Sequence, residues 1–331
     1  MKLLFALACS LLIAAPVLAD TGVEQQRRQQ LTQPGNNAPV WRDVRAGKAH
    51  YTTDKGREAG VLVQSAGETW RQIRNGPVTF YGGWLLVLVA AAILAFYFTR
   101  GPLKLHGKPT GRRIARFGSF ERFVHWSTAI SFCVLGLSGL AMLFGKHVLL
   151  PVFGYGAFGW LAAASKGLHN FIAPLFIVSV LAMVLLFVKD NLFRRYDLQW
   201  LGRAWAVMAR GEHVPTGRFN AGEKVWFWLG VVVLSVIVTW SGLVLLFPNF
   251  DQTRAVMQEA WIWHACAALA YVALSLGHIY LGTIGVEGSY EAMRSGSVDE
   301  TWAKEHHALW YEETSGSKEK TWTRKPSTSA S

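Results

Sequence analysis

Five long apolar stretches dominate this chain and limit what it can fold into. Each is near the roughly 20 residues that an α-helix needs to cross a hydrocarbon core about 30 Å thick. The stretches are Phe80–Thr99, Phe123–Phe144, His169–Val188, Val225–Phe247 and Trp261–Ile284. Tryptophan residues cluster near their ends, and such rings favour the headgroup layer of a membrane. The sequence therefore predicts an all-α integral membrane protein.

The charges between these stretches predict their orientation. The chain is 51% hydrophobic and has a formal net charge of +12, which fits a multispanning protein in contact with membrane lipid better than a nucleic-acid binder. Residues 100–122 and 189–224 each contain seven Lys or Arg residues, whereas the alternate loops contain few. Because basic loops stay in the cytoplasm, we expect a bacterial inner membrane protein with a periplasmic mature N-terminus and a cytoplasmic C-terminus.

The N-terminal region has the composition of an exported segment. Residues 1–19 are typical of a signal peptide, with Lys2, an apolar run and a small-residue cleavage site before Asp20; the alternative is an uncleaved first span. The polar stretch that follows is too short to be expected to fold as an independent domain with its own hydrophobic core. The expected organisation begins with a signal peptide at 1–19, an exported extension at 20–78 and an additional transmembrane helix at 79–99. A four-helix domain at 110–290 and a cytoplasmic tail at 291–331 follow. The spans of the four-helix domain are expected at about 123–144, 169–188, 225–247 and 261–284.

Four histidines lie within the predicted spans. His264 and His278 are fourteen residues apart in the last span, so on a helix they share one face, with Cα atoms about 21 Å apart along the axis. His125 lies near the cytoplasmic end of its span and His169 near the periplasmic end of another. A metal-binding side chain inside a membrane is costly and is therefore a functional-site candidate.

The predicted depths pair His125 with His278 on the inner side, and His169 with His264 on the outer side. Two levels with two imidazoles each match two six-coordinate b-type haems, whose filled axial positions favour electron transfer over oxygen chemistry. The alternative is that all four are hydrogen-bonded packing residues, but two matching depths favour haem. The spans and the two histidine levels together predict an all-α membrane bundle that holds two b-type haems.

Other potential ligands give weaker signals. The three cysteines are scattered without metal-ligand spacing, which argues against zinc and cysteine-bound iron–sulfur sites. His306 and His307 are adjacent in the polar tail, where a solvated pair is the default interpretation. The remaining histidines show no partner in the sequence; they are His50, His106, His147 and His213.

Several separate motifs, in order, resemble the cytochrome b556 (gamma) subunit of membrane-bound respiratory formate dehydrogenase. The matching stretches are RFGSFERFVHW at 116–126, LSGL at 137–140, GLHN at 167–170, FNAGEK at 219–224, GHIY at 277–280, GVEGS at 285–289 and the tail at 302–311. The resemblance covers roughly residues 110–312. The resemblance implies a four-helix transmembrane dihaem cytochrome b bundle. This chain departs from that form by its leader, its exported extension and one additional N-terminal transmembrane helix.

The resemblance implies a subunit that transfers electrons and reduces quinone, while formate oxidation takes place on another chain. The implied partners are an exported catalytic subunit with molybdenum or tungsten and an iron–sulfur subunit. Electrons would reach the outer of two b haems and leave the inner one for menaquinone or ubiquinone near the cytoplasmic face.

The same resemblance implies individual site residues. The family's haem-ligand positions fall on His125, His169, His264 and His278. Asn220, Gly222 and His278 match positions that the family uses around the quinone. Glu223 stands where some relatives have a glutamine, which changes the hydrogen bonding expected there.

Two other classes of function stay open at this point. The helical bundle is shared with the cytochrome b subunits of nickel–iron hydrogenases and thiosulfate reductases, which differ in their partners. A haem-free membrane anchor or transporter would require all four histidines to be structural. The absorbance of b-type haem separates this last class from the others.

Overall fold

The computed structural model describes residues 43–48, 66–248, 250 and 252–322. The expected signal peptide and most of the expected exported extension lie outside the described residues. The chain divides into two compact units, which are treated separately below. Unit 1 contains the described residues up to Gly83 together with Ser131–Pro174 and Thr239–Cys266. Unit 2 contains Trp84–Ile130, Leu175–Val238 and the described residues from Ala267 onwards.

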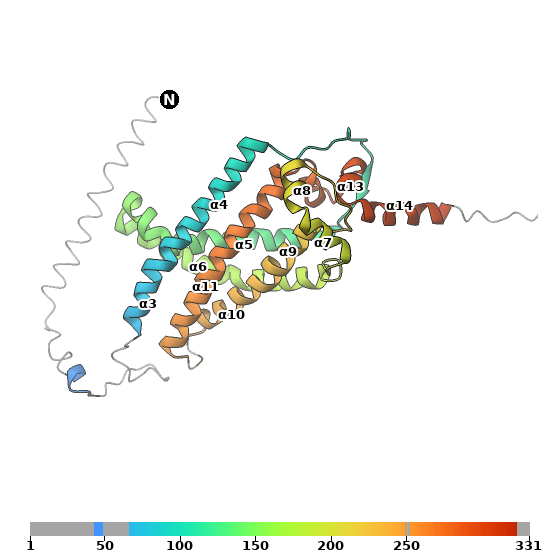
Figure 1. The fold of residues 1–331 in the computed structure, drawn as a ribbon. Coiled ribbons are helices and arrows are strands. Elements are labelled where there is room, and N and C mark those ends of the chain that lie inside the picture. Colours follow the sequence, from blue (N-terminus) through green and yellow to red (C-terminus); the bar gives the residue numbers. More distant parts are fainter. Residues whose placement is uncertain (1–42, 49–65, 249, 251, 323–331) are drawn as a thin grey trace, which may run out of the picture. The chain divides into compact units, whose positions relative to one another are not determined.

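Within the described residues, five helical segments are long and apolar enough to cross a membrane (Figure 1). Each contains one of the apolar stretches identified in the sequence, so the predicted α-helical membrane fold is confirmed. The segments are built from α3 (Gly67–Ile73), η1 (Arg74–Val78), α4 (Thr79–Arg100), α5 (Ser119–Val148), α6 (Leu150–Phe187), α9 (Ala221–Trp226), η2 (Phe227–Leu234), α10 (Ser235–Leu246), α11 (Arg254–Tyr280) and η3 (Leu281–Gly285).

The long helices expose apolar side chains and bury small polar ones. Phe98, Leu137 and Phe171 are 78%, 71% and 80% exposed. The serines buried along these helices are Ser131, Ser138, Ser165, Ser179, Ser235, Ser241 and Ser275. In water this distribution would be unfavourable, but in lipid the exposed apolar surface meets hydrocarbon, and small interior residues let helix backbones approach closely.

Two helices begin earlier than the sequence predicted. The third long helix, α6, begins at Leu150, so His169 lies in its interior rather than at the start of a span. The glycine-rich stretch before His169 resembles a loop, yet only Gly154 leaves the helical conformation, with φ of 72°. At the N-terminal side, α3 and η1 lead directly into α4, so residues 67–78 of the expected extension are helical.

Two of the π-helical segments follow aromatic residues of the long helices. The segment η2 follows Trp226, and η3 follows Tyr280 on α11. A π-helical turn shifts the helix register, and such turns occur frequently at functional sites. Trp226, which precedes η2, contacts one histidine of the pair in unit 2 that is described below.

Unit 2 also contains a small folded region outside the long helices. Strand β1 (Arg113–Ala115) pairs antiparallel with β2 (Ser297–Asp299). The short helices are α7 (Arg195–Gly202), α8 (Ala204–Arg210), α12 (Ser289–Arg294), α13 (Glu300–His306) and α14 (Ala308–Trp322). The C-terminal segment, expected to be a polar tail, is anchored here because Val298, Trp302 and Ala303 are buried.

Candidate haem-binding sites

The four candidate ligand histidines form two pairs, one within each unit. In unit 1, the imidazoles of His169 on α6 and His264 on α11 have ring centres 6.1 Å apart. In unit 2, those of His125 on α5 and His278 on α11 have ring centres 6.3 Å apart. These are the pairs that the sequence predicts from depth. We refer to them as the 169/264 pair and the 125/278 pair.

Both separations fit two imidazoles on opposite sides of one metal ion. A metal–nitrogen bond of about 2.0 Å, with roughly 1.1 Å more from nitrogen to ring centre, puts two such centres about 6.2 Å apart. A direct hydrogen bond of about 2.9 Å between the rings would bring their centres to roughly 5 Å. The observed 6.1 and 6.3 Å therefore match axial ligation of iron and exceed the spacing of a hydrogen-bonded pair.

Serine side chains hold the 169/264 pair. The Ser138 hydroxyl lies 2.9 Å from Nδ1 of His169 and donates to the backbone carbonyl of Val134 at 2.7 Å. Because that hydroxyl has a single proton, Nδ1–H of His169 is the donor in their contact, which leaves Nε2 with the free lone pair that binds a metal. The Ser241 hydroxyl lies 3.2 Å from Nδ1 of His264.

A glycine follows each of these serines, and the histidine ring packs against it. A Cβ atom on Gly139 would lie 3.5 Å from Cε1 of His169, and one on Gly242 would lie 3.2 Å from Cε1 of His264. The same tripeptide, Ser-Gly-Leu, therefore occurs at 138–140 and 241–243, each time against one ligand of the pair. The LSGL motif noted at 137–140 includes the first tripeptide, but Ser241 and Gly242 were not predicted from the sequence, although the repeat is visible in it.

Aromatic rings hold the 125/278 pair. The indole of Trp226 stacks on His278, with ring centres 4.9 Å apart and planes 12° from parallel. Trp126 meets His125 edge-on and donates its Nε1–H to the carbonyl of Met293 at 3.1 Å. Nδ1 of His125 is buried without a hydrogen-bond partner. An unpaired buried nitrogen is costly, so a packing role based on protein hydrogen bonds does not account for this ring.

The residues expected around a quinone lie at the start of α9. Asn220 is the N-cap of this helix: its Oδ1 accepts from the Glu223 backbone at 2.9 Å, and the Glu223 carboxylate accepts from the Asn220 backbone at 2.8 Å. Gly222 leaves room for the Trp200 ring, which a Cβ atom would approach to 2.9 Å. This reciprocal capping fixes the helix that carries Trp226.

Charged residues of unit 2 surround that helix start. Buried Arg116 donates to the Arg218 carbonyl at 2.9 Å and to the Glu223 carboxylate at 3.2 Å. His307, also buried, lies 4.0 Å from the same carboxylate. Burial and the charge of Arg116 hold the pKa of His307 well below its usual range. Its ring is therefore neutral, with Nδ1–H donating to the Gly217 carbonyl at 2.8 Å.

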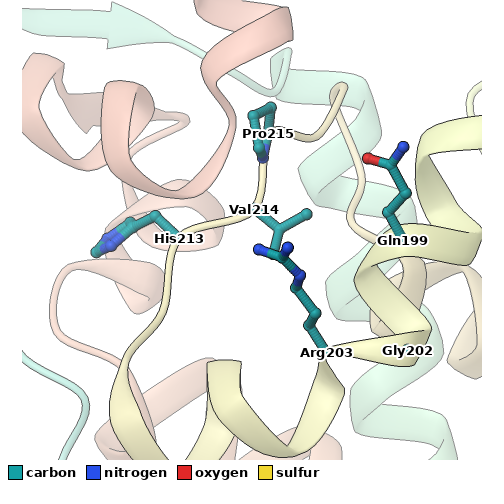
Figure 2. Close-up of a pocket in the computed structure, with 6 residues that line it drawn as sticks. All are labelled: Gln199, Gly202, Arg203, His213, Val214 and Pro215. Atoms are coloured by element: carbon teal, nitrogen blue, oxygen red, sulfur yellow. The ribbon is translucent and has the colours of Figure 1, made fainter.

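An open pocket of about 530 Å³ lies between α7 and the loop that precedes α9 (Figure 2). None of the haem-ligand or quinone candidates lines it. The lining residues are Gln199, Gly202, Arg203, His213, Val214 and Pro215. Figure 2 shows the imidazole of His213 directed away from Arg203 and Gln199.

Residues 116–296, more than half of the chain, match the family model of prokaryotic cytochrome b561. The chain belongs to the prokaryotic cytochrome b561 family. This cytochrome b is a multi-pass membrane protein of electron transport, and b-type haem is the cofactor that the family name implies. The matched range contains all four paired histidines.

Three curated relatives are formate dehydrogenase subunits. The cytochrome b556(fdo) subunit of Escherichia coli K12 is 31% identical over 210 residues, which are 62% of this cytochrome and 96% of the relative. The nitrate-inducible cytochrome b556(Fdn) subunit of the same strain is 30% identical over 207 residues, or 61% and 92% of the two chains. The cytochrome b556 subunit of Haemophilus influenzae is 27% identical over 212 residues, or 61% and 83%.

Proposed function

We propose that this cytochrome b is the membrane subunit of a formate dehydrogenase, with two b haems that connect an iron–sulfur partner to quinone. The observation that carries the proposal is the pair of histidine separations, 6.1 and 6.3 Å, in a chain that aligns with 96% of a formate dehydrogenase cytochrome subunit. Each bound haem, held by one histidine pair, would supply a one-electron carrier. Formate oxidation itself would belong to a catalytic subunit with molybdenum or tungsten.

In this proposal the protein's own residues hold and orient the ligands. Ser138 fixes the tautomer of His169, so that its Nε2 is available for iron, and Ser241 orients the ring of His264. Trp226 fixes the ring plane of His278 by stacking. The long helices that carry both pairs are largely apolar, and low polarity around a redox centre is one of the factors that set its potential.

We infer that quinone is reduced beside the 125/278 pair, at Asn220, Gly222 and His278. Capping of α9 uses the side-chain oxygen of Asn220 and leaves its amide nitrogen to donate to a quinone carbonyl. Gly222 lets the planar ring of Trp200 approach the helix backbone closely, so that this ring borders the proposed site. Menaquinone and ubiquinone both offer the carbonyl that this donor requires.

The loop charges support an orientation with the N-terminal side in the periplasm and the C-terminal segment in the cytoplasm. In that orientation the 169/264 pair lies on the outer side and the 125/278 pair on the inner side. Electrons from an exported partner would move inward while protons for quinone reduction are taken up from the cytoplasm. The overall step would then build a membrane potential.

Affinity purification of the tagged chain from native membranes tests this function. The proposal expects a molybdenum or tungsten subunit and an iron–sulfur subunit to copurify. Anaerobic formate should reduce the b-type α-band, and a soluble quinone analogue should reoxidise it. A His169→Ala variant should block this reduction, whereas His147→Ala, a change at an exposed histidine of α5, should not. Copurification with a nickel-containing subunit, or haem that dithionite reduces but formate does not, would contradict the proposal.

A further inference from the structure

Three segments of unit 2 that are far apart in the sequence bring two imidazoles and a carboxylate together. His106 lies in the loop after α4, His213 in the loop before α9, and Glu305 on α13. Their candidate ligand atoms all lie within 4.8 Å of one another. None of the three belongs to the haem pairs or to the residues proposed around the quinone. Sequence reasoning found no partner for either histidine.

The distances in this cluster are close to those of a tetrahedral zinc site. Zinc bonds of about 2.0–2.2 Å at tetrahedral angles put neighbouring ligand atoms roughly 3.3–3.6 Å apart. Nε2 of His213 lies 3.3 Å from Oε2 of Glu305. Nδ1 of His106 lies 3.8 Å from the same oxygen. The two imidazole centres are 4.6 Å apart, so a small rotation of the exposed His106 ring suffices to close the site.

The carboxylate at the centre of the cluster is held in place by the backbone. Oε2 of Glu305 accepts from the His106 amide at 3.0 Å, and Oε1 accepts from the Gly107 amide at 2.8 Å. Such contacts orient a metal-binding carboxylate and are typical of metal sites. The side chains of His106 and His213 are 63% and 33% exposed, whereas that of Glu305 is 16% exposed. A hydrated ion can therefore reach the histidines from solvent while the carboxylate stays fixed.

A further imidazole adjoins the cluster. His306 follows Glu305 on α13, and its ring centre is 5.8 Å from that of His213. Its Nε2 is buried without a hydrogen-bond partner. His306 is not counted as a ligand, because the three candidate ligand atoms that lie together belong to His106, His213 and Glu305. Two imidazoles and one carboxylate suit a zinc-class ion rather than magnesium or calcium, which prefer oxygen ligands.

We propose that His106, His213 and Glu305 bind a divalent zinc-class ion, with water in the fourth position. Two imidazoles and one carboxylate form an established type of zinc-ligand set. The ion would cross-link the loop after α4, the loop before α9 and the C-terminal segment. It would therefore stabilise the small folded region of unit 2 without taking part in haem binding.

Zinc binding to the purified complex tests this site independently of formate oxidation. The complex is treated with a chelator and dialysed against Zn²⁺ alone, and zinc is then measured by mass spectrometry relative to the chain. The proposal expects one zinc equivalent per chain in the wild type. The variants His213→Ala and Glu305→Gln should each lose this zinc. Affinity should fall at least tenfold in each variant. His147→Ala is the matched control and should retain the zinc.

Two further measurements separate loss of the site from loss of the fold. The haem content of His213→Ala should equal that of the wild type, and the exposed His106→Ala should lose zinc in the same way. Zinc-edge X-ray absorption of the wild type should give two nitrogen and two oxygen neighbours. Equal zinc in the wild type and in all three cluster variants, or no zinc in a wild type with normal haem content, would overturn the proposal.

Discussion

The two histidine pairs have almost the same ring separation but different neighbours. In the 169/264 pair, each ring contacts a serine hydroxyl and lies against a glycine. In the 125/278 pair, His278 is stacked on Trp226, and Nδ1 of His125 has no hydrogen-bond partner. Unit 1 therefore uses hydrogen bonds to orient its imidazoles, and unit 2 uses aromatic packing.

The two pairs therefore reach nearly the same separation of imidazole centres, but they differ in whether a neighbouring side chain fixes the position of the proton on the ring. A serine that accepts from Nδ1–H fixes both the ring orientation and the tautomer of a ligand. Stacking on an indole fixes the ring plane alone. Variants at the neighbours should therefore affect the two pairs separately, and each can be examined alone by removing a ligand of the other pair.

The largest expected effect is on the buried ion pair that anchors α9, the helix that leads to Trp226. Lys224 and Asp197 are 2.7 Å apart, with side chains 1% and 0% exposed. Lys224→Met leaves a buried carboxylate without its partner, which costs about 3–5 kcal/mol of folding free energy. We expect unfolding in detergent at lower denaturant and loss of haem from the 125/278 pair, measured in a His169→Ala background.

Two comparisons test this interpretation. The double variant Lys224→Met/Asp197→Leu removes both charges and should recover most of the lost stability. Arg203→Met removes one partner of an exposed ion pair, Arg203 with Glu212 at 2.7 Å, and should cost less than about 1 kcal/mol. Equal losses for Lys224→Met and Arg203→Met would mean that the buried pair does not anchor the helix.

A smaller effect is expected where Trp226 packs over Gly230. A Cβ atom on Gly230 would lie 2.6 Å from the indole, so Gly230→Ala must displace the ring that stacks on His278. Overpacking of this kind costs about 1–3 kcal/mol. We expect weaker haem retention by the 125/278 pair, measured as haem transfer to apomyoglobin from the His169→Ala background. Gly282→Ala, where a Cβ atom meets nothing within 4 Å, is the control and should retain haem normally.

The smallest expected effect comes from the hydroxyl that fixes His169. Ser138→Ala should lower haem affinity at the 169/264 pair about tenfold, the lower end of the range for residues that orient metal ligands. His264 keeps its contact with Ser241, which limits the loss. The measurement is haem transfer from the His125→Ala background. Ser275→Ala is the matched control, because this buried serine donates to the Tyr271 carbonyl at 2.7 Å; equal losses in both variants would contradict the serine's role.

The five apolar segments and the two histidine pairs could be predicted from the sequence. Hydropathy identifies the segments, and the predicted direction of each span gives the pairing of His125 with His278 and of His169 with His264. The start of α6 could not be predicted, because glycine and Lys166 give the stretch before His169 the composition of a loop. In lipid and against neighbouring helices, that composition folds as helix.

The neighbours of the ligands were harder to predict because they depend on contacts between helices. Nothing in the local sequence indicates that Trp226 stacks on His278. The repeated Ser-Gly-Leu at 138–140 and 241–243 was a readable signal for the 169/264 pair. The cluster of His106, His213 and Glu305 depends on three segments meeting, and pairing of β1 with β2 helps to place the last of them.

Haem content per chain tests the central claim most directly. Pyridine haemochrome analysis of the purified complex should give two b haems per chain in the wild type. His169→Ala and His278→Ala should each give one, and the double variant none. A wild type with fewer than two haems, or a single variant that retains both, would contradict the assignment of one haem to each histidine pair.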